Sequence, residues 1–181
     1  MKTLANPLLL IAICSTIIAA SCKKEKTPAS ELVTVNGQTF GCRVNGRPFI
    51  ADKWDYGNNV PPIHVDFWYN PIGGYRYLIA NGNKSNERVE IYLNPPLVVG
   101  RRELKFRTRS HPTYVDPLDY GYYSTQIPSR EYITNDRIGG YVNILSVDTI
   151  NQKIEARFEF TGTDPANGGT VSVTNGYFKR N

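Results

Sequence analysis

Five Asn-Gly dipeptides are spread along this 181-residue chain, and they restrict its fold more than any other feature. They occur at 36–37, 45–46, 81–82, 167–168 and 175–176. Asn and Gly tolerate the positive φ angles that two-residue hairpin turns require, so the pair is a strong local signal for a β-hairpin. The chain is therefore expected to consist of antiparallel strands joined by tight turns.

Between these turns, apolar and polar residues alternate with a period of two, which is typical of half-buried strands. In 153–160 every second residue is apolar, and we expect Phe158 and Phe160 to lie in the core. Nine or ten strands are predicted, near residues 38–44, 47–51, 63–69, 75–80, 87–93, 103–109, 120–124, 138–147, 153–162 and 170–178. Because the spacings are short and no helices alternate with the strands, the predicted fold is all-β, a single antiparallel β-sandwich or barrel-like domain.

Residues 1–21 are predicted to be a lipoprotein signal peptide, because Lys2 precedes an apolar run that is too short to span a bilayer. The sequence Ala-Ala-Ser-Cys at 19–22 resembles a bacterial lipobox, in which the Cys thiol receives diacylglycerol. An ordinary signal peptide that happens to carry a Cys is the alternative. We predict that Cys22 becomes the first residue of the mature chain and anchors it to a membrane through diacylglyceryl and N-acyl groups.

The polar, Pro-containing residues 22–37 are predicted to be a lipidated tether, and residues 38–181 the β domain. Lys23, rather than an Asp, follows Cys22. This favours the outer membrane, and both the periplasmic and the cell-surface face stay open. The whole chain carries 21 basic and 16 acidic side chains, but residues 38–181 carry 17 and 14, a net charge of only +3. Nucleic acid is therefore not an expected partner.

Several segments carry a resemblance to a known family. Residues 40–46 read Phe-Gly-Cys-Arg-Val-Asn-Gly, and residues 171–178 read Val-Ser-Val-Thr-Asn-Gly-Tyr-Phe, while the middle of the chain, about 52–135, matches no motif. The two ends resemble a family of small Bacteroidota-type lipoproteins of unknown function. The resemblance implies an all-β, periplasmic or surface-exposed domain, and it implies no activity. Within the first motif, Cys42 shares a strand face with apolar neighbours, so it is expected to pack inward, with Arg43 on the opposite face.

No catalytic machinery is recognised, and an enzyme is not expected. The chain has no Gly-x-Ser-x-Gly or Ser-x-x-Lys motif and no phosphate-binding loop. Its two histidines, His64 and His111, belong to no short-spaced ligand motif, so neither a metal nor another cofactor is expected. Asp116 and Asp119 could act as an acid and a base, and a carboxylate-dependent glycan hydrolase is kept as an alternative.

Basic residues are concentrated in 101–109. If this segment is a strand, Arg101, Lys105, Arg107 and Arg109 lie on one face together with Glu103. Such a stripe could bind an anionic glycan or peptide. A solvated strand face that discourages edge pairing is the alternative.

Aromatic residues gather in the unmatched middle of the chain. Tyr120 and Tyr122 are candidates to assist the basic stripe, because tyrosine offers a flat face and a polar edge. In 63–69, His64 is expected to share a face with Asp66 and Trp68. The function predicted from sequence is a lipid-anchored extracytoplasmic β domain with a binding or structural role, and its sharper version is an anionic glycan or peptide binder. For the aromatic residues, the alternative to a binding role is that half of them pack in the core.

Overall fold

The computed structural model describes residues 31–52, 61–70, 75–105 and 118–181 of the chain. Twelve antiparallel strands lie in these ranges and form one hydrogen-bonded sheet. They are β1 (Val33–Val35), β2 (Gln38–Val44), β3 (Arg47–Phe49), β4 (Ile63–Asn70), β5 (Tyr75–Lys84), β6 (Glu87–Leu93), β7 (Gly100–Leu104), β8 (Tyr120–Gln126), β9 (Ser129–Ile133), β10 (Gly140–Asp148), β11 (Lys153–Thr163) and β12 (Thr170–Arg180). The predicted all-β class is confirmed. No helix in the described ranges is long and apolar enough to cross a membrane.

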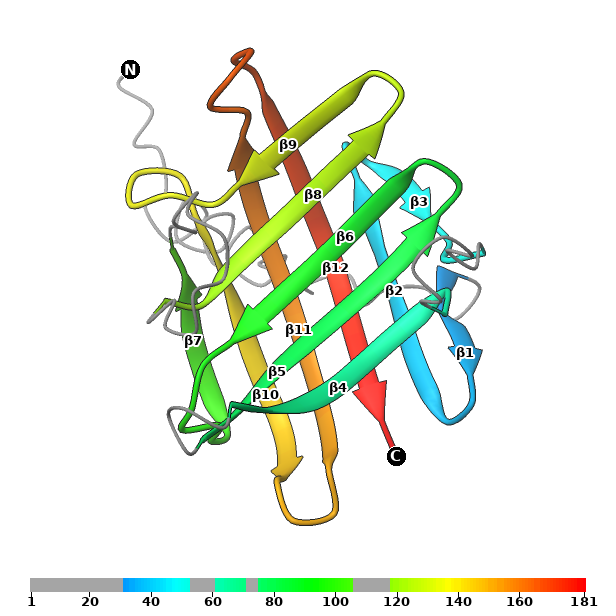
Figure 1. Ribbon diagram of the computed structural model, residues 1–181, viewed down its shortest axis with the longest axis vertical. Helices are drawn as coiled ribbons and strands as arrows, with labels where there is room; N and C mark the ends of the chain where they lie inside the picture. Colours follow the sequence, from blue (N-terminus) through cyan, green and yellow to red (C-terminus); the bar gives the residue numbers. More distant parts are fainter. Residues whose placement is uncertain (1–30, 53–60, 71–74, 106–117) are drawn as a thin grey trace, which may run out of the picture.

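The sheet folds over into two layers that face each other (Figure 1). Strands β4, β5, β6, β8 and β9 form one layer, which we call the β5 layer. Strands β1, β2, β3, β7, β10, β11 and β12 form the other, which we call the β12 layer. A single residue pair, Thr163 with Ile133, joins the layers where β11 meets β9. The sheet is not closed into a barrel, so the sandwich alternative is the one observed.

Strands β1, β7 and β9 differ from the sequence-based expectation, and β5 runs four residues beyond its predicted end. The tether was expected to continue to residue 37, but Val33–Val35 pairs with β2, so the sheet begins earlier. Strand β9 was not predicted, because its sequence Ser-Arg-Glu-Tyr-Ile shows no alternation of apolar and polar residues, and only Ile133 is buried. Strand β7 was expected at 103–109, whereas it runs over Gly100–Leu104. Each of the strands β1, β7 and β9 has at most one buried residue, which is too few for a hydrophobic pattern to indicate where the strand begins and ends.

The Asn-Gly pairs have two different roles. Those at 36–37 and 45–46 form hairpin turns with positive φ angles, as predicted, and the pair at 167–168 lies in the connection between β11 and β12. The pairs at 81–82 and 175–176 lie inside β5 and β12. A turn at 81–82, between the strands predicted at 75–80 and 87–93, was therefore a wrong prediction, whereas 175–176 lies within the strand predicted at 170–178. Asn175 has a φ of 53° and lies where the pairing of β12 with β2 shifts register. The same dipeptide therefore marks an irregularity inside a strand.

Large aromatic side chains from the β12 layer fill the space between the layers. Phe40, Phe158 and Phe178 are fully buried, and Phe160 is almost fully buried, which confirms the expectation for Phe158 and Phe160. Opposite them, the β5 layer presents glycines: a Cβ atom on Gly82 would lie 2.6 Å from the ring of Phe40. The core is packed so closely here that an added methyl group would not fit.

Cys42 lies in this core with no exposed surface, as predicted, and forms no disulfide. Burial raises the pKa of its thiol far above the ordinary value, because the charged thiolate would lose its hydration. Arg43, the next residue, points to the other face of β2 and forms an ion pair with Glu31 at 2.6 Å. Cys42 is therefore a core residue rather than a reactive thiol.

Candidate functional site

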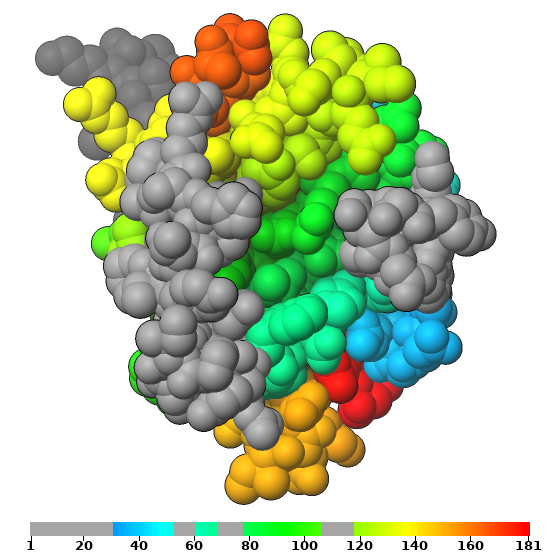
Figure 2. All heavy atoms as spheres, in the orientation of Figure 1, coloured from blue at the N-terminus to red at the C-terminus, as the bar shows by residue number. Residues whose placement is uncertain are grey.

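The outer face of the β5 layer carries a connected group of polar and aromatic side chains, which we call the polar face. Their strand neighbours, such as Val65 and Ile91, point into the core, so alternation places this group outside. Figure 2 shows this side of the molecule, with the atoms of β5 and β6 lying deeper than those of β4 and of β8 and β9. The polar face consists of His64, Asp66, Trp68, Ile79, Asn81, Asn83, Arg88, Glu90, Tyr92, Tyr120 and Tyr122.

Glu90 lies near the centre of the polar face, and only 7% of its surface is exposed. Its two carboxylate oxygens have separate partners: Arg88 Nη2 donates to Oε2, and the hydroxyl of Tyr120 donates to Oε1 at 3.1 Å. A buried carboxylate is tolerated only when it is paired and hydrogen-bonded in this way. Arg88 Nε is buried and has no hydrogen-bond partner in the described part of the chain.

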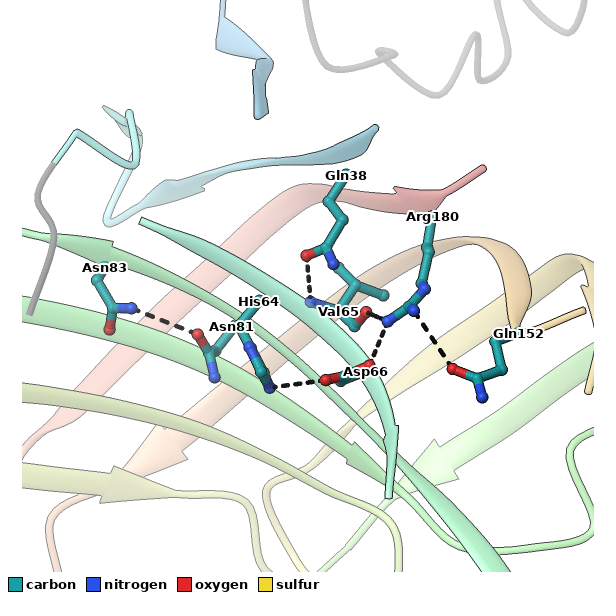
Figure 3. Close-up of polar contacts among 8 residues, drawn as sticks. All are labelled: Gln38, His64, Val65, Asp66, Asn81, Asn83, Gln152 and Arg180. Atoms are coloured by element: carbon teal, nitrogen blue, oxygen red, sulfur yellow. Dashed lines mark hydrogen bonds and ion pairs between the residues drawn. The ribbon is translucent and has the colours of Figure 1, made fainter. Parts of the chain in front are cut away.

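Asn81 lies beside Glu90 in the sheet and is also buried. Its side-chain oxygen accepts a hydrogen bond of 3.4 Å from Asn83 Nδ2, which also donates to the carbonyl oxygen of Pro61 at 2.9 Å. The amide–amide contact is visible in Figure 3. Polar groups buried on the outward side of a sheet are unusual, because such positions normally face water.

Tyr120 and Tyr122 belong to the polar face, but both are buried, with 6% and 8% of their surfaces exposed. The ring of Tyr120 stacks on Tyr92 with centroids 4.9 Å apart, and the hydroxyl of Tyr122 donates to Glu131 Oε1 at 3.0 Å. Their rings are therefore not exposed stacking surfaces, contrary to the expectation from sequence. The two buried tyrosines hold the carboxylates of Glu90 and Glu131 by hydrogen bonds and do not form the exposed surface of the site.

Two long side chains from the β12 layer reach the free edge of β4 (Figure 3). Val65 donates its backbone N–H to Gln38 Oε1 at 2.8 Å, and its carbonyl oxygen accepts from Arg180 Nη1 at 2.8 Å. Arg180 also pairs with Asp66, and its Nη2 donates to Gln152 Oε1 at 3.3 Å. These contacts satisfy backbone groups that an edge strand leaves unpaired, and they fix the position of Asp66.

His64 and Trp68 flank Asp66 on the outer side of β4, as the alternation predicted. Their ring centroids are 6.0 Å apart, and 47% of the surface of Trp68 is exposed. Burial lowers the pKa of His64 below 6.5, with Arg88 and Arg180 acting in the same direction and Asp66 opposing them. The imidazole is therefore mainly neutral at pH 7. Its Nε2 lies 3.6 Å from Asp66 Oδ2, which is too long for a hydrogen bond.

The basic stripe is only partly within the described residues, since Arg107 and Arg109 lie outside them. Arg101 is exposed, and its guanidinium carbon lies 3.9 Å from the ring centroid of Tyr141. Lys105 Nζ lies 3.5 Å from Glu103 Oε2, and both side chains are mostly exposed. Arg101, Glu103 and Lys105 thus alternate outward as predicted, but Glu103 offsets part of the charge. Binding of an anionic glycan or peptide through this stripe stays a prediction.

Arg102 points away from the stripe and forms a bidentate pair with Asp119, with Nε to Oδ2 at 2.6 Å and Nη2 to Oδ1 at 3.0 Å. Burial raises the pKa of Asp119, although the backbone N–H of Asn94 and the charge of Arg102 oppose this shift. With both oxygens bonded to Arg102, Asp119 is held as a structural partner. The other proposed hydrolase residue, Asp116, lies outside the described residues, as do His111 and Cys22, the residue predicted to be lipidated.

Among the described residues, no group of three or more His, Cys, Asp or Glu side chains is arranged to hold a metal ion. Comparisons of the chain with protein-family models, with curated proteins and with solved structures find no match. The site is therefore interpreted from its own chemistry. Sequence reasoning placed His64, Asp66 and Trp68 on one face, but it missed Arg180 and Gln152, because no local pattern signals contacts between residues that are 114 positions apart, as Arg180 and Asp66 are, or 28 apart, as Arg180 and Gln152 are.

Proposed function

We propose that this chain is a lipid-anchored, extracytoplasmic binding protein whose ligand surface is the polar face of the β5 layer. The observation that carries the proposal is the burial of Asn81 and Glu90 on the outward side of the sheet, with their side chains held by Asn83, Arg88 and Tyr120. Binding requires polar groups that are fixed before the ligand arrives, since ordering them on contact reduces affinity.

The shape of the face supports this proposal. Atoms of β5 and β6 lie deeper than those of the strands on either side (Figure 2), and ligand sites are usually concave. The strands themselves form a continuous antiparallel series from β4 to β9, so the side chains stand on a rigid support. A shallow face of this kind fits a binding role better than a reaction that requires an enclosed, dry site.

A ligand array tests the binding role. The full chain, held in lipid nanodiscs, is applied to an array of neutral glycans, anionic glycans and peptides, and specific binding to at least one class is expected. Ile79→Arg puts a long charged side chain at the centre of the polar face and should weaken that binding by about tenfold or more, about 1.4 kcal/mol. Leu145→Arg is the matched control, because Leu145 lies on β10 of the other layer and is exposed.

Two outcomes would contradict the proposal. Absence of binding across the whole array would argue for a structural role. Equal binding by the wild type and the Ile79→Arg variant would place the ligand on another surface, and the basic stripe would then be the next candidate. Thermal unfolding of both variants, followed by circular dichroism, separates a blocked face from a disturbed fold.

The anchor is tested separately, at Cys22. Replacement of Cys22 by Ser removes the thiol that would carry diacylglycerol, so the protein should leave the membrane fraction and incorporate no labelled fatty acid. Cys42→Ser is the control, because that thiol is buried in the core and is not available for acylation. Unchanged membrane fractionation of the Cys22→Ser variant would exclude lipid anchoring at this position.

A further inference from the structure

One corner of the polar face, together with two side chains from the β12 layer, combines an exposed aromatic ring with polar atoms that still have hydrogen-bonding capacity. We call this the Trp68 cluster; it consists of His64, Asp66, Trp68, Gln152 and Arg180. Of the side chains whose burial the structure describes, Trp68 is the only exposed aromatic. Exposure of a large flat apolar surface next to charged groups is typical of a contact surface rather than of packing.

The polar atoms of the cluster are only partly used. Asp66 Oδ1 accepts from Arg180, whereas Oδ2 accepts no hydrogen bond from the described residues. Gln152 uses its side-chain oxygen to accept from Arg180, which leaves its amide NH₂ group as a donor. Neutral His64 supplies one donor and one acceptor nitrogen. The ring of Trp68 lies beside His64, and Asp66 is linked through Arg180 to Gln152, so a ligand that spans this corner would meet an aromatic face together with both acceptors and donors.

We propose that the Trp68 cluster binds a neutral saccharide, with a sugar ring stacked on Trp68 and its hydroxyl groups hydrogen-bonded to Asp66 Oδ2 and the Gln152 amide. A pyranose ring presents an apolar C–H face and an edge of hydroxyl groups, and the cluster presents the complementary pair of surfaces. This inference rests on the proposed function and identifies the class of its ligand.

Charge favours a neutral ligand over an anionic one. The negative charge of Asp66 is balanced by Arg180, and His64 is mainly uncharged at pH 7, so the cluster has no surplus positive charge. A carboxylate or sulfate group on the ligand would approach the oxygen of Asp66 that has no cationic partner at hydrogen-bond distance. Like charges at such short range disfavour binding.

The edge contacts of β4 argue against an extended peptide that would bind by strand addition. A peptide that adds to a sheet edge binds through the free backbone N–H and C=O groups of the edge strand. At Val65 these two groups already bond to Gln38 and Arg180. The central position for strand addition is therefore closed, while the outward side chains of β4 stay accessible.

Titration with neutral hexasaccharides tests this inference. The full chain in nanodiscs, free of sugar-based detergent, is titrated with cellohexaose, maltohexaose and mannohexaose by isothermal calorimetry, and with trigalacturonate as an anionic probe. At least one neutral hexaose is expected to bind, with the same affinity from about 50 to about 500 mM NaCl, because screening does not act on an uncharged ligand. Trigalacturonate should bind more weakly or not at all.

Variants assign the binding to the cluster. Trp68→Ala should weaken binding by about tenfold or more, Trp68→Phe should retain most of it, and Asp66→Asn should weaken it, since an amide replaces the free acceptor oxygen with mixed donor and acceptor groups. Ile150→Ala is the control: Ile150 is an exposed apolar residue in the hairpin between β10 and β11, outside the cluster. Unchanged thermal unfolding of each variant shows that its fold is intact.

These experiments distinguish a failure of the saccharide inference from a failure of the proposed binding function. If no neutral hexaose binds, or if Trp68→Ala binds as tightly as the wild type, the saccharide inference is overturned. If another ligand of the array still binds and Ile79→Arg weakens it, the binding function of the polar face stands. Binding of trigalacturonate that weakens with salt and survives Trp68→Ala would overturn the inference and favour the basic stripe.

Discussion

The two layers of this domain use their faces differently. The β12 layer contributes Phe40, Phe158, Phe160 and Phe178 to the core, whereas the β5 layer contributes mainly aliphatic side chains, two aromatic ones (Phe67 and Tyr123), and glycines that receive the rings of Phe40 and Phe160. Outside, the pattern is reversed. The β5 layer buries polar groups such as Glu90, while outward residues of β11 such as Arg157 are only half-buried. One layer mainly supplies the packing, and the other holds a fixed polar surface.

The largest effect on stability is expected for the buried aromatic residues of the β12 layer. Phe158→Ala removes a fully buried ring and should lower the free energy of unfolding by about 3–5 kcal/mol, measured by chemical denaturation. Its neighbour Arg157 points outward, so Arg157→Ala should cost about 0.5 kcal/mol or less. A loss below about 1 kcal/mol for Phe158→Ala would contradict the conclusion that the β12 layer mainly supplies the core packing.

The glycines of the β5 layer give the next effect. A Cβ atom on Gly121 would lie 2.6 Å from the ring of Phe160, so Gly121→Ala should lower the free energy of unfolding by about 1–3 kcal/mol through overpacking. Phe160→Leu in the same chain should recover part of this loss, because the smaller side chain leaves room for the new methyl group. Simple additivity of the two changes would show that the residues do not share this space.

Breaking a charge pair should cost more stability on the polar face than on the basic stripe. Arg88→Met leaves the buried carboxylate of Glu90 with Tyr120 as its remaining partner and should cost about 1–2 kcal/mol, a range reduced because Arg88 is partly exposed. Lys105→Met breaks only the exposed pair with Glu103 and should change stability by less than about 0.5 kcal/mol. Equal effects from both substitutions would remove the distinction between these surfaces.

The smallest effect concerns the pH dependence of His64. Its folded pKa lies below 6.5, so the unfolded chain binds more protons between these two values. The free energy of unfolding should therefore fall as the pH drops from about 6.5 towards the folded pKa, and no further below it. NMR titration should show a pKa below 6.5, and Asp66→Asn should lower it more, because Asp66 opposes the shift. His64→Gln should remove this dependence, and a pKa above 6.5 would contradict the burial of the imidazole.

The amino-acid sequence determined those features that depend on local geometry. A period of two fixes which side chains share a strand face, and this placed Cys42, Phe158 and Phe160 inside and His64, Asp66 and Trp68 together. Most of the strand positions follow from the same alternation. The short strands β1 and β9 could not be predicted in this way, because they bury too few residues to show a pattern.

Only the tertiary structure decided which outward side chains are covered and what they contact. Alternation places Tyr120 and Tyr122 on one face, but it does not reveal that they are buried there, nor that Glu90 is buried and bonded to Tyr120. The Asn-Gly pair at 81–82 has the composition of a turn, yet it lies in β5 because Phe40 of the other layer packs against Gly82. Arg180 reaches Val65 across 115 positions of sequence. Such contacts arise from the packing of one layer on the other, and local residue patterns carry no information about them.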